Sequence, residues 1–241
     1  MLFPKIDKIL ESIIDVIFPK NCLFCQKEKT FLCDDCQSTF DFPQDFLCLC
    51  QKPKALIKIG KCISCQEKFL DGLLAPLSFD ELRVQKLIHA FKYEPFIKEL
   101  GKSLAEVIIK YFYWKNYQPF KKSLIIPIPA DQKRIKWRGY NPSEIIAKEL
   151  AQKFNLVLVS DLLLKTKKTK PQAKLSLKER QENLKNAFAL KKAKILQGKL
   201  IYLIDDVYTS GSTMEEAAKI LKREGAKKVF GIVAARAFNL E

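Results

Sequence analysis

The sequence predicts an α/β protein in which helices cover both faces of a parallel sheet, preceded by a small cysteine-rich module. All eight cysteines of the 241-residue chain lie between residues 22 and 65. From about residue 73, short apolar runs alternate with longer segments of helical periodicity, and continuous apolar strands are typical of parallel sheets that are buried on both faces. We predict an N-terminal amphipathic helix over residues 1–19, the cysteine-rich module over 20–70 and the sheet domain over 73–241.

The N-terminal segment has the apolar stripe of a helix, formed by Ile6, Ile9, Leu10, Ile13, Ile14 and Ile17. Charged residues such as Asp7 and Asp15 interrupt it, which argues against the uncharged core of a signal peptide. No run of 18 apolar residues occurs in the chain, so we expect no transmembrane segment. We therefore expect a cytoplasmic protein, in which cysteines stay reduced and available to a metal.

The cysteines are spaced as metal ligands, in the pairs Cys22/Cys25, Cys33/Cys36, Cys48/Cys50 and Cys62/Cys65. A C-x-x-C turn directs two thiolates to one tetrahedral Zn²⁺, and two such turns complete a closed structural site. The spacing predicts one or two structural zinc ions, with disulfides disfavoured because no secretory signal is expected. The C-x-C pair departs from the usual spacing, and a sequential and a cross-braced partition of the four pairs both remain open.

In the sheet domain, we predict strands over 73–79, 123–129, 200–204 and 229–235. Helical periodicity covers 81–93, 95–114 and 141–154, and a further helix follows residue 213. The helix over 141–154 has a clear start signal, with Asn141 as N-cap, Pro142 at the first helical position and Glu144 at the third. Ligands of such sheets bind beyond the carboxyl ends of the strands.

The strongest functional signal follows the strand over 200–204. Asp205 and Asp206 come directly after it, and a loop of hydroxyls around one glycine leads into the next helix: Thr209, Ser210, Gly211, Ser212 and Thr213. Free backbone N–H groups at a helix N-terminus, together with hydroxyl donors, are suited to bind a phosphate. The two carboxylates suit sugar hydroxyls or Mg²⁺. The combination predicts a ribose 5-phosphate site.

A simpler interpretation of the same loop is an ordinary helix start. Ser212 with Glu215, and Thr213 with Glu216, both fit the spacing of a capping box. That interpretation explains the hydroxyls, but it gives no role to two acids at the end of a buried strand.

The segment "LIYLIDDVYTSGST" resembles the signature of the type I phosphoribosyltransferases, which bind phosphoribosyl pyrophosphate (PRPP) with Mg²⁺. Together with "HAFKY", "IPIPADQKRIKWRGYN" and "KPQAKLSLKERQENLKNAF", in that order after the paired cysteines, the chain resembles the ComF (ComFC-like) family of competence proteins over residues 16–237. The resemblance implies a double zinc ribbon followed by a phosphoribosyltransferase-like domain.

The resemblance also implies roles for individual residues. Asp205 and Asp206 would face the ribose, Thr209 to Thr213 the 5′-phosphate, and Ala130 and Asp131 the pyrophosphate, with Arg138 supplying counter-charge. The implied catalytic groups are Asp205, Asp206 and Arg138. Two further sets complete the family pattern, a mobile loop with Gln172, Arg180 and Asn183, and a Lys-aromatic pair formed by Lys92 and Tyr93. The chain departs from the pattern at Pro142, where the family commonly has Gln, and at Ser210, which replaces a threonine.

The charge favours a polyanionic partner, although a general lysine enrichment would give the same balance. The formal net charge is +16, from 43 Lys and Arg against 27 Asp and Glu, and residues 165–174 form a lysine-rich run. The ComF resemblance implies handling of single-stranded DNA on the cytoplasmic side during natural transformation, near an uptake helicase or channel. The alternatives are an active Mg·PRPP-dependent phosphoribosyltransferase with an unknown acceptor, and a PRPP-sensing adaptor.

Overall fold

The computed structural model describes residues 19–167, 179, 185–191 and 193–238. The chain forms two compact units, Met1–Asp41 and Phe42–Glu241, so their division falls inside the segment predicted as one cysteine-rich module. The boundaries predicted from the sequence stay a prediction. The helix predicted over 1–19 lies outside the described residues, apart from Pro19.

The smaller unit has one short described helix, α2 (Asp34–Ser38). The Cys33 sulfur caps it by accepting a hydrogen bond from the Cys36 backbone N–H. An isolated bridge between Asn21 and Glu28 closes the turn that carries the first C-x-x-C pair.

The larger unit is built on a six-stranded sheet, and the parallel sheet predicted from the sequence is confirmed. Its strands are β3 (Gly72–Leu74), β4 (Leu77–Ser78), β5 (Leu124–Pro127), β6 (Val157–Leu158), β9 (Leu200–Tyr208) and β10 (Lys228–Arg236). They lie in the order β3–β10–β9–β5–β6, with β4 also on β10, and every pair is parallel. The strand predicted over 73–79 is two short strands, because Pro76 between them has no backbone N–H to donate.

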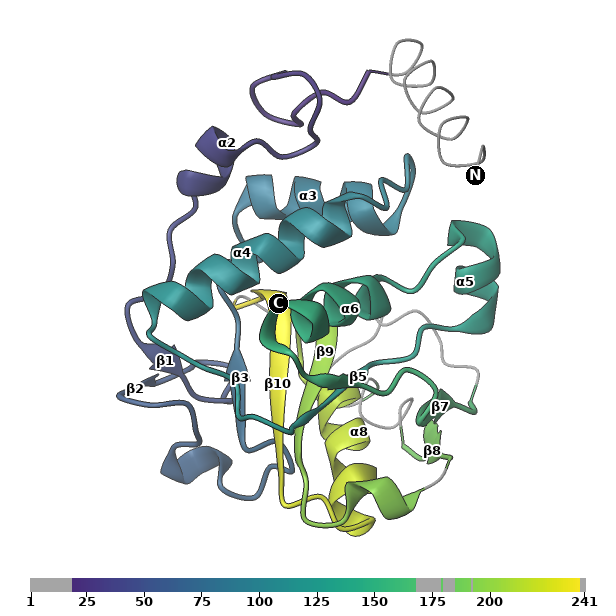
Figure 1. The fold of residues 1–241 in the computed structure, drawn as a ribbon. Coiled ribbons are helices and arrows are strands. Elements are labelled where there is room, and N and C mark those ends of the chain that lie inside the picture. Colours follow the sequence, from purple (N-terminus) through teal and green to yellow (C-terminus); the bar gives the residue numbers. More distant parts are fainter. Residues whose placement is uncertain (1–18, 168–178, 180–184, 192, 239–241) are drawn as a thin grey trace. The chain divides into compact units, whose positions relative to one another are not determined.

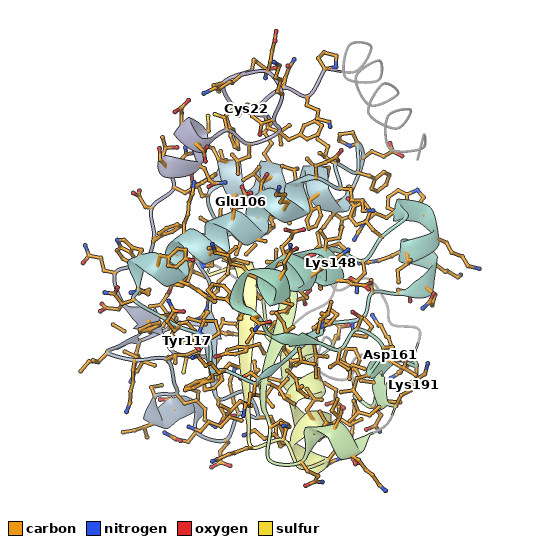
Figure 2. All side chains as sticks on the ribbon, viewed as in Figure 1. Cys22, Glu106, Tyr117, Lys148, Asp161 and Lys191 are labelled. Atoms are coloured by element: carbon orange, nitrogen blue, oxygen red, sulfur yellow. The ribbon has the colours of Figure 1, made fainter. Side chains whose placement is uncertain are left out.

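Five helices accompany this sheet among the described residues: α3 (Leu82–Lys92), α4 (Leu100–Trp114), α5 (Gln132–Arg138), α6 (Pro142–Phe154) and α8 (Ser212–Arg223). Helices α4 and α6 pack on one face and α8 on the other (Figure 1). Helix α4 begins five residues later than predicted, because Phe96 has a left-handed φ of 55° that no α-helix accommodates. Glu106 and Lys148 project from the solvent-facing sides of α4 and α6 (Figure 2).

The core lies between the sheet and these helices. On the α8 side, alternate strand residues such as Ile126, Leu203 and Val233 pack with Met214 and Leu221 of the helix, as the two-residue repeat of a strand requires. On the other side, the buried Tyr202 bonds through its hydroxyl to that of Tyr117 at 2.7 Å.

Two small antiparallel pairs complete the larger unit, and the sequence did not predict either. One joins β1 (Phe46–Leu47) to β2 (Ala55–Leu56), and the other joins β7 (Leu163–Lys165) to β8 (Phe188–Leu190). Two 3₁₀ turns, η1 (Ile63–Cys65) and η3 (Ala193–Leu196), lie in the connections. Within the described ranges, no helix combines the length and the apolar character needed to cross a bilayer.

Candidate functional site

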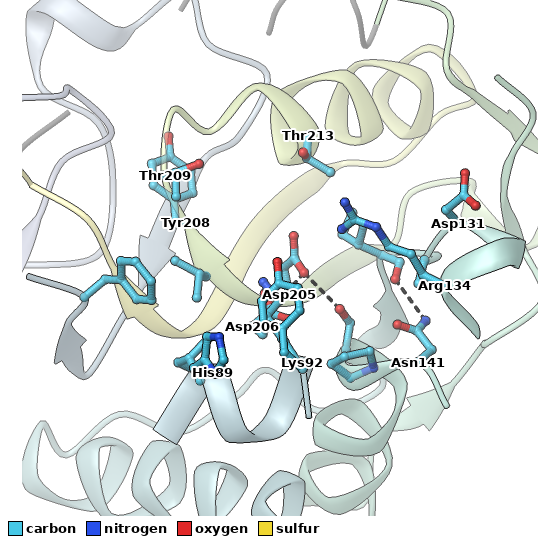
Figure 3. A pocket seen from close by; sticks show the side chains of 18 of the residues that line it. His89, Lys92, Asp131, Arg134, Asn141, Asp205, Asp206, Tyr208, Thr209 and Thr213 are labelled. Atoms are coloured by element: carbon cyan, nitrogen blue, oxygen red, sulfur yellow. Dashed lines mark hydrogen bonds and ion pairs between the residues drawn. The ribbon is translucent and has the colours of Figure 1, made fainter. Parts of the chain in front are cut away.

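A pocket of about 940 Å³ opens where the carboxyl ends of β5 and β9 meet the N-terminus of α8 (Figure 3). Helix α3, the β5–α5 connection, α5, the start of α6 and β7 contribute the remaining walls. This is the position that the strand-end rule predicts for a ligand of a parallel sheet.

The two acids lie side by side in the wall of this pocket, but inside a strand. Strand β9 runs on to Tyr208, and Asp205 is still paired with Val233 of β10. The neighbour on the other side, β5, ends its pairing at Ile204. The acids are therefore held by one neighbour only, and their other side is open to the pocket. The sequence prediction that the strand ends before the acids is wrong, because it followed the apolar run and not the backbone pairing.

Each acid has its own partner. Asp206 is 4% exposed and forms an ion pair with Lys92 of α3, with 2.7 Å between Oδ1 and Nζ. Asp205 accepts a hydrogen bond of 2.9 Å from the Ser143 hydroxyl and another of 2.9 Å from the Asp206 backbone N–H. The half-buried Lys92 ammonium thus forms an ion pair with one of two adjacent carboxylates.

This imbalance shifts the ionisation of the site. Burial raises the pKa of Asp205, and the charge of Asp206 raises it further, to about 7, despite the opposing effects of Lys92 and Ser143. Burial would lower the pKa of Lys92, but the charges of Asp206 and Asp205 outweigh it and raise the value. A cation or hydroxyl donors placed over Asp205 would relieve the excess negative charge.

The hydroxyl loop, residues 209–213, forms the opposite wall. Gly211 is the N-cap of α8 with φ of 77°, and a Cβ there would overlap the Tyr208 side chain, so only glycine fits. The Ser210 and Ser212 hydroxyls lie 3.0 Å apart. The loop therefore presents hydroxyls and the first backbone N–H groups of α8 to the pocket, an arrangement suited to an anion.

The capping-box interpretation of this loop does not hold. The N-cap of α8 is Gly211, which has no side chain to form the capping bond, and the Ser210 hydroxyl accepts a 3.4 Å hydrogen bond from the Ser212 backbone N–H. Glu215 instead accepts a 2.8 Å hydrogen bond from the Phe69 backbone N–H, and Glu216 accepts one of 2.9 Å from the Asn186 backbone N–H. Both glutamates are engaged by other segments of the chain.

The third wall contains the residues expected near a pyrophosphate. Ala130 and Asp131 line the pocket after β5, and Asp131 caps α5 by accepting a 2.9 Å hydrogen bond from the Lys133 backbone N–H. Arg138 is only 8% exposed and lines the pocket, and its Nε has no hydrogen-bond partner among the described residues. Burial lowers the pKa of Arg138, although Asp206 partly offsets this. A buried guanidinium nitrogen without a partner indicates a missing acceptor.

The structure brings most of the predicted site residues together. Lys92 and Tyr93 line the pocket, as do Asp205, Asp206, Thr209, Ser210, Gly211, Thr213, Ala130, Asp131 and Arg138. Ser212 is reached through its contact with Ser210. The predicted mobile-loop residues Gln172, Arg180 and Asn183 lie outside the described residues.

Sequence reasoning did not assign several residues of the pocket lining to the site. Ser143 supports Asp205, and its place directly after Asn141-Pro142 at a helix start was an available signal. Asn141 is the predicted N-cap of α6 by position, but its side chain donates to the Ile128 carbonyl at 3.0 Å. Lys165, from β7, and the exposed His89, from α3, also line the pocket; they lie in the lysine-rich run and in the "HAFKY" motif, but neither pattern assigned them to the site.

The eight cysteines form two groups in the sequential order. The first cysteine group is Cys22, Cys25, Cys33 and Cys36, and the second is Cys48, Cys50, Cys62 and Cys65. In each group all four sulfurs lie within 4.8 Å of one another. The Sγ–Sγ distances of 3.4 Å for Cys25–Cys33 and 3.5 Å for Cys50–Cys62 are close to the roughly 3.8 Å edge of a tetrahedral site with Zn–S bonds of about 2.3 Å. Each group therefore fits a structural zinc ion, and the C-x-C spacing is accommodated.

Each group also contains a thiol that ionises readily. Burial acts to raise the pKa of Cys22, but hydrogen bonds with backbone groups of Cys25 and Cys33 lower it to about 6. Burial likewise acts to raise the pKa of Cys62, and hydrogen bonds with the Cys50 and Cys48 thiols lower it to about 6. A thiolate at neutral pH is the form that coordinates a metal.

Comparison with known proteins agrees with this geometry. Residues 98–237 match the family described as phosphoribosyl transferase domain. Competence protein F from Haemophilus influenzae is 26% identical over 220 residues, which are 88% of this chain and 95% of that protein. Competence protein ComFC from Streptococcus pneumoniae is 26% identical over 92% of this chain and 96% of that protein.

A further relative matches a shorter segment at higher identity. The DNA utilization protein YhgH from Escherichia coli O157:H7 is 38% identical over 105 residues, 44% of this chain and 45% of that protein. The chain belongs to the phosphoribosyl transferase domain family, and over most of its length it is homologous to the competence proteins of the ComF kind that its motifs resemble.

Proposed function

We propose that the pocket binds PRPP with Mg²⁺ and that the protein handles single-stranded DNA on the cytoplasmic side during DNA uptake. The binding of PRPP is supported by one observation: three walls of the same pocket each suit a different part of this ligand. The hydroxyl loop suits the 5′-phosphate, Asp205 and Asp206 suit the ribose hydroxyls, and Arg138 suits the pyrophosphate.

The donor set also fits a hydrated Mg²⁺ carried by the pyrophosphate. Mg²⁺ usually takes one or two protein carboxylates, keeps several waters and shares the substrate phosphates. Burial and the charge of Asp206 raise the pKa of Asp205 to about 7, so a divalent cation nearby would favour its ionised form. When bound, the metal would neutralise charge on the pyrophosphate.

The second part of the proposal has support from charge and from the relatives. Two relatives are named competence proteins and another a DNA utilization protein. The net charge is +16, and the pocket rim carries Lys86, Lys133, Arg134 and Lys165. Such a rim would attract a strand through its phosphates without reading its sequence. An uptake helicase or channel would be the natural source of the strand.

Phosphoribosyl transfer is the second candidate function, and one observation favours it. The pocket continues past the acids to His89, away from Asp131 and Arg134 (Figure 3), and Phe79 and Leu82 also belong to its lining. An acceptor placed there would face the ribose from the side opposite the leaving pyrophosphate. The protein would then contribute orientation, counter-charge and exclusion of water.

A competition titration tests the proposal. A fluorescein-labelled single-stranded oligonucleotide is titrated with the protein by anisotropy, with and without Mg·PRPP, at one fixed ionic strength. We expect Mg·PRPP to weaken strand binding at least about tenfold in the wild type. The Asp205→Asn/Asp206→Asn variant should lose this effect, whereas Asp161→Asn, an exposed carboxylate outside the pocket, should retain it. If Mg·PRPP does not change the affinity for the oligonucleotide, the DNA binds outside the pocket. If the protein does not bind the oligonucleotide at all, the proposal that it handles single-stranded DNA is contradicted.

A further inference from the structure

The second cysteine group is connected to the hydroxyl loop by a short chain of buried contacts. Arg236, at the end of β10, is 1% exposed and donates from Nη1 to the Cys48 carbonyl at 2.6 Å and from Nη2 to the Cys50 carbonyl. The guanidinium is therefore hydrogen-bonded to the backbone on both sides of Leu49, at the two cysteines of the C-x-C pair.

The next contact leads to the loop. The register of the sheet places Arg236 beside Tyr208, and the guanidinium carbon lies 5.3 Å from the centre of the Tyr208 ring. Tyr208 is 3% exposed, and its hydroxyl lies 3.5 Å from the Leu49 carbonyl. The same ring fills the space in which a Cβ at Gly211 would lie. The Tyr208 side chain thus packs directly against Gly211 of the hydroxyl loop.

A second connection runs in parallel. Glu215, in the first turn of α8, accepts the 2.8 Å hydrogen bond from the Phe69 backbone N–H, four residues after Cys65. Lys68, next to Phe69, donates to the Leu49 carbonyl at 2.8 Å. Both ends of the second cysteine group are therefore tied to the loop and helix that form the anion site.

The buried positive charge of Arg236 explains why it would favour a zinc ion in the second cysteine group. Among the described residues, no carboxylate lies within ion-pair distance of Arg236. A zinc ion with four thiolates carries a net negative charge, which would compensate the buried guanidinium.

We infer that Arg236 and Tyr208 are positioning residues that couple zinc binding at the second cysteine group to anion binding at the hydroxyl loop. Zinc at this group would fix the backbone of the C-x-C pair, whose carbonyls bind the Arg236 guanidinium and whose Leu49 carbonyl lies next to the Tyr208 hydroxyl. Arg236 and Tyr208 in turn keep the hydroxyl loop in place around Gly211. Coupling between two binding sites is reciprocal, so a bound anion should also strengthen zinc binding at the second group by the same factor. The inference rests in part on the proposed function, because PRPP is the anion used to measure it.

The test compares one ligand substitution in each cysteine group of the full chain. Cys62→Ser disables the second group, and Cys25→Ser is the matched control in the first. Hydrogen exchange of the amides of residues 209–213, without ligand, reports the loop directly. We expect at least about tenfold faster exchange in Cys62→Ser and less than twofold change in Cys25→Ser. Mg·PRPP affinity should follow the same pattern, and Mg·PRPP should slow zinc release to a chelator only from the second group.

The outcomes separate the inference from the proposed function. If wild-type protein does not bind PRPP but Cys62→Ser still loosens the loop, the coupling holds and the proposed ligand is wrong. Equal effects of the two serine variants, or an unchanged loop after loss of the second zinc, would overturn the coupling. Should Cys62→Ser not fold, Arg236→Lys replaces it. This variant keeps the positive charge but cannot donate to the Cys48 and Cys50 carbonyls together. It should speed hydrogen exchange in residues 209–213 threefold or more while both zinc ions are retained. Unchanged exchange would overturn the inference.

Discussion

Asp205→Asn should stabilise the free protein while it weakens ligand binding. The pKa of Asp205 rises from 3.8 to about 7 on folding, which corresponds to about 4 kcal/mol at about 1.4 kcal/mol per pKa unit. Because Asp205 shares the site with Asp206 and Lys92, we take about half of this, roughly 2 kcal/mol, as the effect of one substitution. Asparagine removes the charge and keeps an oxygen that accepts from Ser143.

The sign of the effect depends on pH. A carboxyl with a raised folded-state pKa favours the native state when it is protonated, and this contribution is lost as pH rises from about 4 through 7. The gain from Asp205→Asn should therefore be about 2 kcal/mol at pH 8 and below about 1 kcal/mol at pH 5. In a unit of this size, about 2 kcal/mol raises Tm by about 4–8 °C.

Intrinsic tryptophan fluorescence is a suitable assay, because both tryptophans, Trp114 and Trp137, belong to the larger unit. Thermal unfolding of wild type, Asp205→Asn and the exposed control Asp161→Asn is recorded without ligand at pH 5 and pH 8. A variant that is no more stable than wild type at pH 8, or whose gain does not change with pH, would refute the reasoning.

Three further predictions concern the same pocket. Lys92→Met leaves Asp206 buried without its cation and should lower the free energy of unfolding, measured by tryptophan fluorescence, by about 3 kcal/mol, near the lower end for a buried pair because the Lys92 side chain is 24% exposed. A loss below about 1 kcal/mol would contradict the ion pair. Gly211→Ala, which combines a φ of 77° with an overlap against Tyr208, should weaken Mg·PRPP at least about tenfold in calorimetry, and an affinity within twofold of wild type would count against the anion loop. Arg138→Met should weaken Mg·PRPP by about 1.5–3 kcal/mol but leave inorganic phosphate binding nearly unchanged, and equal losses for both ligands would remove its assignment to the pyrophosphate.

The periodicity of the sequence predicts the sheet domain well where burial is continuous. The runs at 200–204 and 229–235 lie within strands of the parallel sheet, and the run at 123–129 contains the shorter strand β5, Leu124–Pro127. Helix α6 begins at Pro142, as its start signal predicts. Strand β9 nevertheless extends to Tyr208, because pairing with β10 continues after the apolar pattern ends, and a single strand does not reveal how long its neighbour is.

The site could be predicted only where its residues follow one another in the chain. The acids and the hydroxyl loop are consecutive and were found, as were the motifs at Lys92 and Arg138. Ser143 and Lys165 reach the pocket through the packing of α6 and β7, which the sequence alone does not specify. The paired cysteines indicated one or two zinc sites, but their spacing left the partition open, and the structure shows the sequential one.

The central claim is that the pocket is a site for PRPP, and calorimetric titration of the zinc-loaded full chain with Mg·PRPP tests it most directly. We predict saturable one-site binding in the wild type and a loss of at least about 100-fold in Asp205→Asn/Asp206→Asn, with tryptophan fluorescence confirming that the variant is folded. No binding to the wild type, or equal binding to the variant, would contradict the claim.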